Sequence, residues 1–130
     1  MDLNQLILDA SSRIKPFIRK TNFCRSETFS KLLDGEVYFK LENQQFTGSF
    51  KARGALNKIL TINDAEKSIR SVISASTGNH GAAVAYAARQ ANIECNIYVP
   101  KGSSKAKLSK MKSYGANIAI FGNDCVEAEG

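Results

Sequence analysis

Residues 71–88, SVISASTGNHGAAVAYAA, join a short apolar strand pattern to an alanine-rich helix pattern. The first five residues predict a short buried strand, and residues 79–91 predict a helix. Between the two, residues 74–81 supply a turn of small and hydroxyl-bearing side chains. A strand that leads directly into a helix is the building unit of parallel α/β sheets.

The same alternation continues on both sides of this stretch. Strand patterns cover residues 36–42, 93–99 and 117–121, and helix patterns cover residues 3–14, 28–33, 50–60, 103–114 and the chain from Asp124 onward. The Lys15-Pro16 step predicts the end of the first helix, and Gly115 takes the C′ position after the helix over 103–114. Strand and helix alternate four times, which predicts an α/β fold, a parallel sheet with flanking helices.

The charge of the chain is unevenly distributed. The 130 residues carry a net charge of +6, and five lysines fall between Lys101 and Lys112. We interpret these lysines as a solvated helix face. Because Tyr114 is the one aromatic residue beside them, a base-stacking surface is poorly supported and no nucleic-acid partner is expected.

Metal and membrane sites receive little support from the composition. The three cysteines form no CxxC pair and His80 is the single histidine, so no metal site is expected. No apolar run approaches membrane-spanning length, and residues 1–13 lack the features of a signal peptide. We therefore expect a cytoplasmic protein without membrane association.

The turn over residues 74–81 has two interpretations. Small residues at a helix N-terminus expose N–H groups that bind anions such as carboxylates, with Ser76, Thr77 and Asn79 as further donors. Simple N-capping by serine or threonine explains the same residues. His80 is compatible with a catalytic role or with a structural one.

A second turn, over residues 43–53, places Lys51 in the first turn of a helix. The helix dipole disfavours a cation there, and we expect Phe46 and Phe50 to desolvate the amine. Both effects favour the neutral amine, which is a nucleophile toward carbonyl groups. An ordinary exposed lysine explains the same residue, so the pattern leaves both possibilities open.

Three segments bear a resemblance to a known family. KLENQQFTGSFKARGA (40–55) resembles the lysine segment of fold-type II pyridoxal-phosphate enzymes, in particular the threonine/serine dehydratase and serine racemase group. SASTGNHGAAVAYAA (74–88) resembles the substrate-carboxylate loop of that group, and YVPKGSSKAKLSKMKSYGA (98–116) is similar to the helix and turn that follow. The resemblance extends over roughly residues 10–130.

The resemblance implies roles for individual residues. Lys51 would be the catalytic lysine that carries pyridoxal 5′-phosphate and moves the proton at the substrate α-carbon. Phe50 would pack against the pyridine ring, and Asn79 would bind the ring hydroxyl. The amino acid carboxylate would be held by Ser76, Thr77, Gly78, Asn79 and His80.

The resemblance also implies a reaction, with one branch left open. A lyase of this group dehydrates and deaminates a hydroxy amino acid such as threonine or serine to a 2-keto acid and ammonia. Related racemases, acting on serine or aspartate, use a serine hydroxyl at the position of Thr77 as a second acid/base. Dehydratases often have alanine there. Thr77 is therefore a catalytic candidate, and the strings TGSFKARGA and GNHGAAVAYAA favour the dehydratase.

Some features depart from the family pattern. Thr21-Asn22-Phe23 replaces the usual Thr-Pro-Leu, and no glycine run here matches the family's phosphate-binding loop, which lies beyond residue 130.

By resemblance, residues 1–44 form an N-terminal segment of the large domain and residues 45–130 form the small domain. We expect a fragment of a longer enzyme that is homo-oligomeric at full length. A non-catalytic α/β module of the same ancestry is the alternative.

Overall fold

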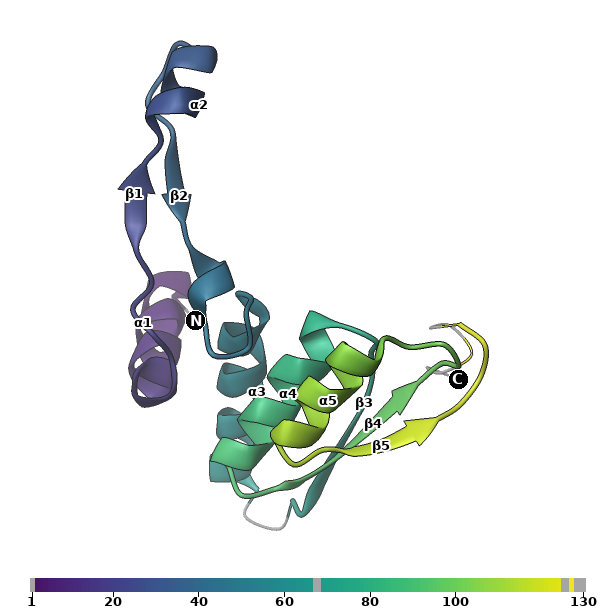
Figure 1. The fold of residues 1–130 in the computed structure, drawn as a ribbon. Coiled ribbons are helices and arrows are strands. Elements are labelled where there is room, and N and C mark those ends of the chain that lie inside the picture. Colours follow the sequence, from purple (N-terminus) through teal and green to yellow (C-terminus); the bar gives the residue numbers. More distant parts are fainter. Residues whose placement is uncertain (1, 67–68, 125–126, 128–130) are drawn as a thin grey trace.

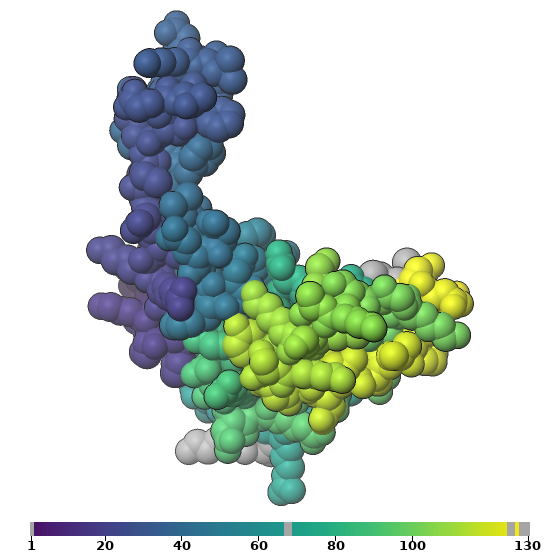
Figure 2. Space-filling model, viewed as in Figure 1, coloured from purple at the N-terminus to yellow at the C-terminus, as the bar shows by residue number. Residues whose placement is uncertain are grey.

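The computed structural model describes residues 2–66, 69–124 and 127. Figure 1 shows an α/β body, residues 45–122, from which a narrow arm, residues 22–41, projects. The space-filling view shows the arm standing clear of the body along most of its length (Figure 2).

The body is a three-stranded parallel sheet covered by helices. Its strands are β3 (Ser71–Ala75), β4 (Glu94–Val99) and β5 (Asn117–Ile120), in the order β3-β4-β5. Its helices are α3 (Lys51–Ala65), α4 (Asn79–Gln90) and α5 (Lys105–Ser113), which lie on one side of the sheet (Figure 1). The predicted α/β class with a parallel sheet is confirmed. Gly115 has φ +89°, as its predicted C′ position requires.

The core lies between the sheet and α4. All residues from 81 to 88 are buried, and their small side chains allow the helix to approach its neighbours closely. Leu56 of α3, Ile97 of β4 and Met111 of α5 are fully buried around it. Alternate residues of β4 point into this core, since Cys95, Ile97 and Val99 are buried.

The N-terminal helix is fastened to the body. Helix α1 (Leu3–Ile14) ends where the 3-10 turn η1 (Lys15–Phe17) begins, so the predicted break at Lys15-Pro16 is confirmed. Ile14 is buried in the core, and the Tyr86 hydroxyl donates to the Phe17 carbonyl at 2.7 Å. No helix in the described part of the chain is long and apolar enough to cross a membrane.

The arm corrects one prediction. It consists of β1 (Phe23–Arg25), α2 (Glu27–Leu32) and β2 (Tyr38–Lys40), and the 3-10 turn η2 (Glu42–Gln44) leads from it into the body. The strand predicted over 36–42 does not join the parallel sheet but pairs antiparallel with β1, which the sequence pattern did not predict. A single alternating segment does not specify its partner, and here the chain returns locally through α2.

A second correction concerns β3, which was predicted to be buried. Ile73 is 70% exposed. Strand β3 is an edge strand in the described part of the chain, and the helices cover the opposite face of the sheet. The helix predicted from Asp124 onward falls largely outside the described residues.

Candidate functional site

Both candidate turns lie at the same end of the body. Helix α3 precedes β3 and α4 follows it, so both helices run against the strand direction and begin at its carboxyl end. The two helices also pack directly against each other. Ligands of parallel α/β proteins bind at this edge of the sheet, and the fold therefore brings Lys51 and residues 74–81 to one edge.

Lys51 is the first residue of α3, and its side chain is exposed. Its ammonium lies 5.1 Å from the centroid of the Phe50 ring, which is itself 60% exposed. An aromatic ring thus stands beside an accessible amine at the start of a helix. The expected desolvation by two phenylalanines is wrong for Phe46, which packs elsewhere.

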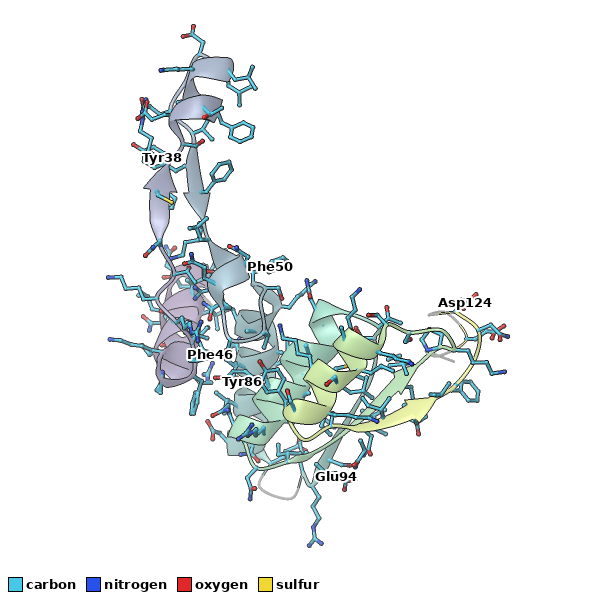
Figure 3. All side chains as sticks on the ribbon, viewed as in Figure 1. Tyr38, Phe46, Phe50, Tyr86, Glu94 and Asp124 are labelled. Carbon is cyan, nitrogen blue, oxygen red and sulfur yellow. The ribbon has the colours of Figure 1, made fainter. Side chains whose placement is uncertain are left out.

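Phe46 belongs to an aromatic cluster at the base of the loop. Its ring stacks on Tyr86 with centroids 5.6 Å apart, and Arg19 lies 4.4 Å above it (Figure 3). Tyr86 in turn meets Tyr114 edge to face at 5.4 Å. Burial is the main reason why the pKa of both phenols is raised, so each hydroxyl remains a donor at neutral pH.

The loop before Lys51 is tied down on both sides. The Gln45 amide donates to the Arg19 carbonyl at 2.8 Å and accepts from the Arg19 N–H at 3.1 Å. From α5, the Lys110 ammonium donates to the Thr47 carbonyl at 2.8 Å, and the Tyr114 hydroxyl donates to the Phe46 carbonyl at 2.7 Å. Hydrogen bonds from Arg19 on one side and from α5 on the other therefore restrain the loop.

Ser49 is an exception within this loop. Its hydroxyl is buried and has no hydrogen-bond partner among the described residues, although its carbonyl accepts from Thr47 at 3.4 Å. A buried hydroxyl without a partner is unfavourable in a stable core, and a role in ligand binding or catalysis is one explanation for it.

In the second loop, the capping interpretation applies to Ser76. Its Oγ accepts from the N–H groups of Gly78 at 3.2 Å and Gly81 at 3.0 Å. Asn79 and His80, the first two residues of α4, are exposed, and Thr77 is half-buried. Ser76 therefore shapes the loop, and Asn79 and His80 are accessible to a ligand.

A shallow hollow of about 270 Å³ lies between α3 and α4 near this edge. One wall is the α3 face with Gly54, Ala55 and Lys58, and His80 and Val84 of α4 form another. Because residues three and four apart share a helix face, Lys51 lies one turn above Gly54 and Ala55. His80 therefore lies on the side of α4 that faces the lysine-bearing face of α3.

An ion pair fixes the first turn of α3. Arg53 donates to both carboxylate oxygens of Glu42, at 2.8 and 2.9 Å, and the Thr21 hydroxyl donates to Glu42 at 2.7 Å. The hydrogen bonds from Arg53 are the main reason why the pKa of Glu42 falls to about 2. The pair joins η2 to α3 two residues after Lys51.

The remaining ionisable candidates offer no alternative centre. Burial raises the pKa of the Cys95 thiol to about 11, so it is not a nucleophile at neutral pH. Among the described residues, no group of three or more His, Cys, Asp or Glu side chains is placed to hold a metal ion.

Sequence reasoning missed the residues that hold the loops in place. Lys110 was grouped with the solvated lysines, and it is indeed exposed, but its ammonium also bonds a carbonyl 63 residues away. Met111 was not singled out either, yet its side chain lies against Gly81 at the start of α4. Neither residue has a local signal in the sequence, because both contacts are long-range.

Comparison with known proteins agrees with this geometry. The family model described as pyridoxal-phosphate dependent enzyme matches residues 14–130. The catabolic L-threonine dehydratase of Staphylococcus aureus strain N315 is 44% identical over 119 residues, which are 91% of this chain and 34% of that protein. The chain thus spans about a third of the length of this curated relative.

Solved structures give the same result. A pyridoxal 5′-phosphate-dependent aspartate racemase superposes with a TM-score of 0.90 and 38% identity, over 97% of this chain and 40% of that one. Maize serine racemase superposes with a TM-score of 0.88 and 33% identity, over 96% of this chain and 38% of that one. By its sequence and its fold, the chain belongs to the pyridoxal-phosphate dependent enzyme family.

Proposed function

We propose that this chain carries the cofactor lysine and the substrate loop of a pyridoxal-phosphate-dependent ammonia-lyase. The enzyme would convert a hydroxy amino acid such as threonine or serine to a 2-keto acid and ammonia. The observation that carries the proposal is the place where α3 and α4 begin. Lys51 opens one helix and the Ser76–His80 loop opens the other, at the same edge of the sheet.

The residues at this edge fit the ring end of the cofactor. The Lys51 amine is accessible, the Phe50 ring lies beside it, and the exposed Asn79 amide is available to a ring hydroxyl. The buried, unpartnered hydroxyl of Ser49 is a further polar group in the same loop. Among the described residues there is no glycine-rich cradle for the phosphate, and we assign no residue to that group.

The protein side chains have distinct tasks in this proposal. When bound, the cofactor supplies the electron sink for the carbanion at the substrate α-carbon. The Lys51 amine would take the proton from that carbon, and the β-hydroxyl of the substrate would leave as water. N–H groups at the start of α4, with Asn79 and His80, would hold the substrate carboxylate beside it. The Glu42–Arg53 pair would fix the direction in which α3 presents Lys51.

A racemase of serine or aspartate is the second candidate. It is favoured by the hydroxyl of Thr77 and by the similarity to an aspartate racemase and a serine racemase, 38% and 33% identical. The dehydratase is favoured by the 44% identical L-threonine dehydratase. After the α-proton is removed, the lyase would lose the β-hydroxyl, whereas the racemase would return a proton to the opposite face from a second acid/base.

The proposal is tested in the complete enzyme with Lys51→Ala and, as a control, Lys107→Ala, which changes an exposed lysine of α5. Removing the lysine that bears the cofactor should lower keto acid formation by at least about a thousandfold. The Lys107 variant should retain its activity. Full turnover by Lys51→Ala without added amine would overturn the proposal.

Thr77→Ala separates the two candidates. In a dehydratase, this variant should form keto acid at nearly the original rate and lose any racemisation of the substrate. Chiral chromatography of the remaining amino acid, run beside the keto acid assay, measures both rates. Equal loss of both reactions would remove the acid/base role from Thr77.

We also infer the setting of the complete protein from its relatives. Residues 1–44 would belong to a large domain and residues 45–130 to the small one, in a cytoplasmic homo-oligomer. Limited proteolysis with mass mapping tests the boundary, and light scattering of the complete enzyme tests the oligomer. Cleavage that shows no preference for the region around residue 44 would contradict the domain boundary. A molecular mass equal to that of one chain would contradict the homo-oligomer.

A further inference from the structure

We propose that Lys110 is a positioning residue for Lys51, and that α5 holds the lysine loop and the substrate loop in register. Tyr114 assists by binding the same loop. The inference rests on the proposed role of Lys51 and deepens it, because it identifies what holds the catalytic lysine in place. Neither residue touches the reacting atoms in this account.

The first step is the pair of bonds from the end of α5 to the loop. Lys110 and Tyr114 are one helical turn apart and face the same way. Their donor atoms reach the carbonyls of two successive residues, Thr47 at 2.8 Å and Phe46 at 2.7 Å. In the space-filling view, the yellow-green surface of α5 meets the blue-teal segment before α3 (Figure 2).

The second step is the tightness of the turn that Lys110 meets. Gly48 has φ +76°, and its N–H donates to the Gln45 carbonyl at 2.8 Å. A β-carbon at Gly48 would lie 3.1 Å from the Lys110 ammonium, so the ammonium rests directly on this turn. Thr47 is 1% exposed, and its carbonyl would lose a charged donor if Lys110 were removed.

The third step is the contact of α5 with the other loop. Met111, next to Lys110, is fully buried, and its Cε would lie 2.9 Å from a β-carbon at Gly81. Gly81 donates its N–H to Ser76, which shapes the substrate loop. Helix α5 thus contacts the turn before Lys51 through Lys110 and the loop before α4 through Met111.

The aromatic cluster stabilises the same arrangement from below. Phe46 and Tyr86 face each other in Figure 3, and Tyr114 packs edge to face on Tyr86 while its hydroxyl bonds the Phe46 carbonyl. The cluster fixes the start of the loop. Lys110 fixes the turn nearer Lys51, and its removal should therefore have the larger effect on that lysine.

The test uses Lys110→Met in the complete enzyme, because methionine keeps the unbranched stem and the helix propensity while removing the donor. Lys110→Arg is the rescue variant, and Tyr114→Phe removes one hydroxyl. Lys112→Met is the matched control, since Lys112 is exposed in the same helical turn. Three readouts are taken: amide exchange at Gly48, the rate of Lys51 acetylation by trace acetic anhydride without cofactor, and kcat and KM with cofactor.

Lys110→Met should speed amide exchange at Gly48 by about tenfold, because the turn opens more often. It should change the acetylation rate of Lys51 by about threefold or more and lower kcat more than it raises KM. Lys110→Arg should recover most of each effect, Tyr114→Phe should show smaller changes of the same sign, and Lys112→Met should show none.

Two results would overturn the inference. One is that the rates of Gly48 exchange and Lys51 acetylation in Lys110→Met equal those of the Lys112→Met control. The other is an equal rise in exchange at all core amides, which would mean a general loss of stability. The cofactor-free readouts also separate this inference from the proposed function. Full activity of Lys51→Ala would overturn the proposed function alone, because the response of Gly48 to Lys110→Met does not depend on it.

Discussion

Apolar residues make up a similar fraction of the arm and of the body, but the two regions use them differently. In the arm, Leu32 is 72% exposed and Phe23 is 66% exposed. In the body, Leu56, Ile97 and Met111 are fully buried. The arm is held together by local pairs, such as the stacked rings of Phe23 and Tyr38 at 5.1 Å, whereas the body has a common core.

This difference shows that residue type alone does not decide burial. Residues 81–88 of α4 are small or medium in size except for Tyr86, and they allow α3, α5 and the sheet to approach one axis. Large residues from those elements are then covered. The arm has only three-residue strands and a six-residue helix, which offer no second layer. Lys51 and the Ser76 loop stand on the part with the deep core, which suits residues that require a fixed geometry.

The largest contrast is expected between two leucines. Leu56→Ala should lower the free energy of unfolding by about 2–5 kcal/mol, because it leaves a cavity in the core. Leu32→Ala, in the arm, should change it by less than about 0.5 kcal/mol. Urea unfolding followed by circular dichroism measures both, and equal effects would remove the distinction between arm and body.

Two glycines should respond in opposite directions. Gly81→Ala places a β-carbon 2.9 Å from Met111 Cε and 3.1 Å from the Ser76 carbonyl, so we expect a loss of about 1–3 kcal/mol. Gly54→Ala, inside α3 with open space around it, should stabilise the fold by about 0.5–1 kcal/mol. Thermal melting of both variants decides the matter, and a stabilised Gly81→Ala would contradict the packing described at α5.

The Glu42–Arg53 ion pair, which connects the arm to the body, should be sensitive to acid. The pKa of Glu42 is lowered from 4.5 to about 2, chiefly by Arg53, so its ionised form stabilises the native state. This contribution is complete above pH 4.5 and is lost as the pH falls toward 2. Glu42→Gln should lower the free energy of unfolding at pH 7 by about 1 kcal/mol. Between pH 4.5 and 2, the free energy of unfolding of this variant should fall less than that of the original protein.

A matched control for Glu42 is available in the arm. Glu36 also pairs with an arginine, Arg25, but the Glu36 side chain is 63% exposed, against 16% for Glu42, and is screened by solvent. Glu36→Gln should therefore leave the melting temperature unchanged across the same pH range. If stability depended on pH in the same way in Glu36→Gln and Glu42→Gln, the Glu42–Arg53 pair would contribute no more than the exposed pair in the arm.

The most local effect is expected within the arm itself. Phe29→Ala removes the edge-to-face pair with Phe39, whose centroids are 5.4 Å apart, a loss of about 0.5–1.5 kcal/mol. Amide exchange should rise in β1 and β2 and remain unchanged in α4, since the arm stands apart from the core. Faster exchange in α4 would show that the two regions unfold together.

Sequence reasoning succeeded where the signals are local. Periodicity and caps predicted α1, α4 and the parallel strands, because hydrophobic spacing and the Lys15-Pro16 and Gly115 signals are local. The pairing of β1 with β2, the exposure of Ile73 and the stacking of Phe46 on Tyr86 depend on which segments meet in space, which hydrophobic spacing does not specify. Lys51 could be selected only through resemblance to a family, because a single exposed lysine at a helix start has no distinguishing pattern.

The measurement that tests the central claim most directly is peptide mapping after the purified protein is treated with pyridoxal phosphate and borohydride. The account predicts one dominant adduct, on the peptide that contains Lys51, and its loss in Lys51→Ala. Adducts scattered over several lysines, with none dominant at Lys51, would contradict the claim that the body presents this lysine to the cofactor.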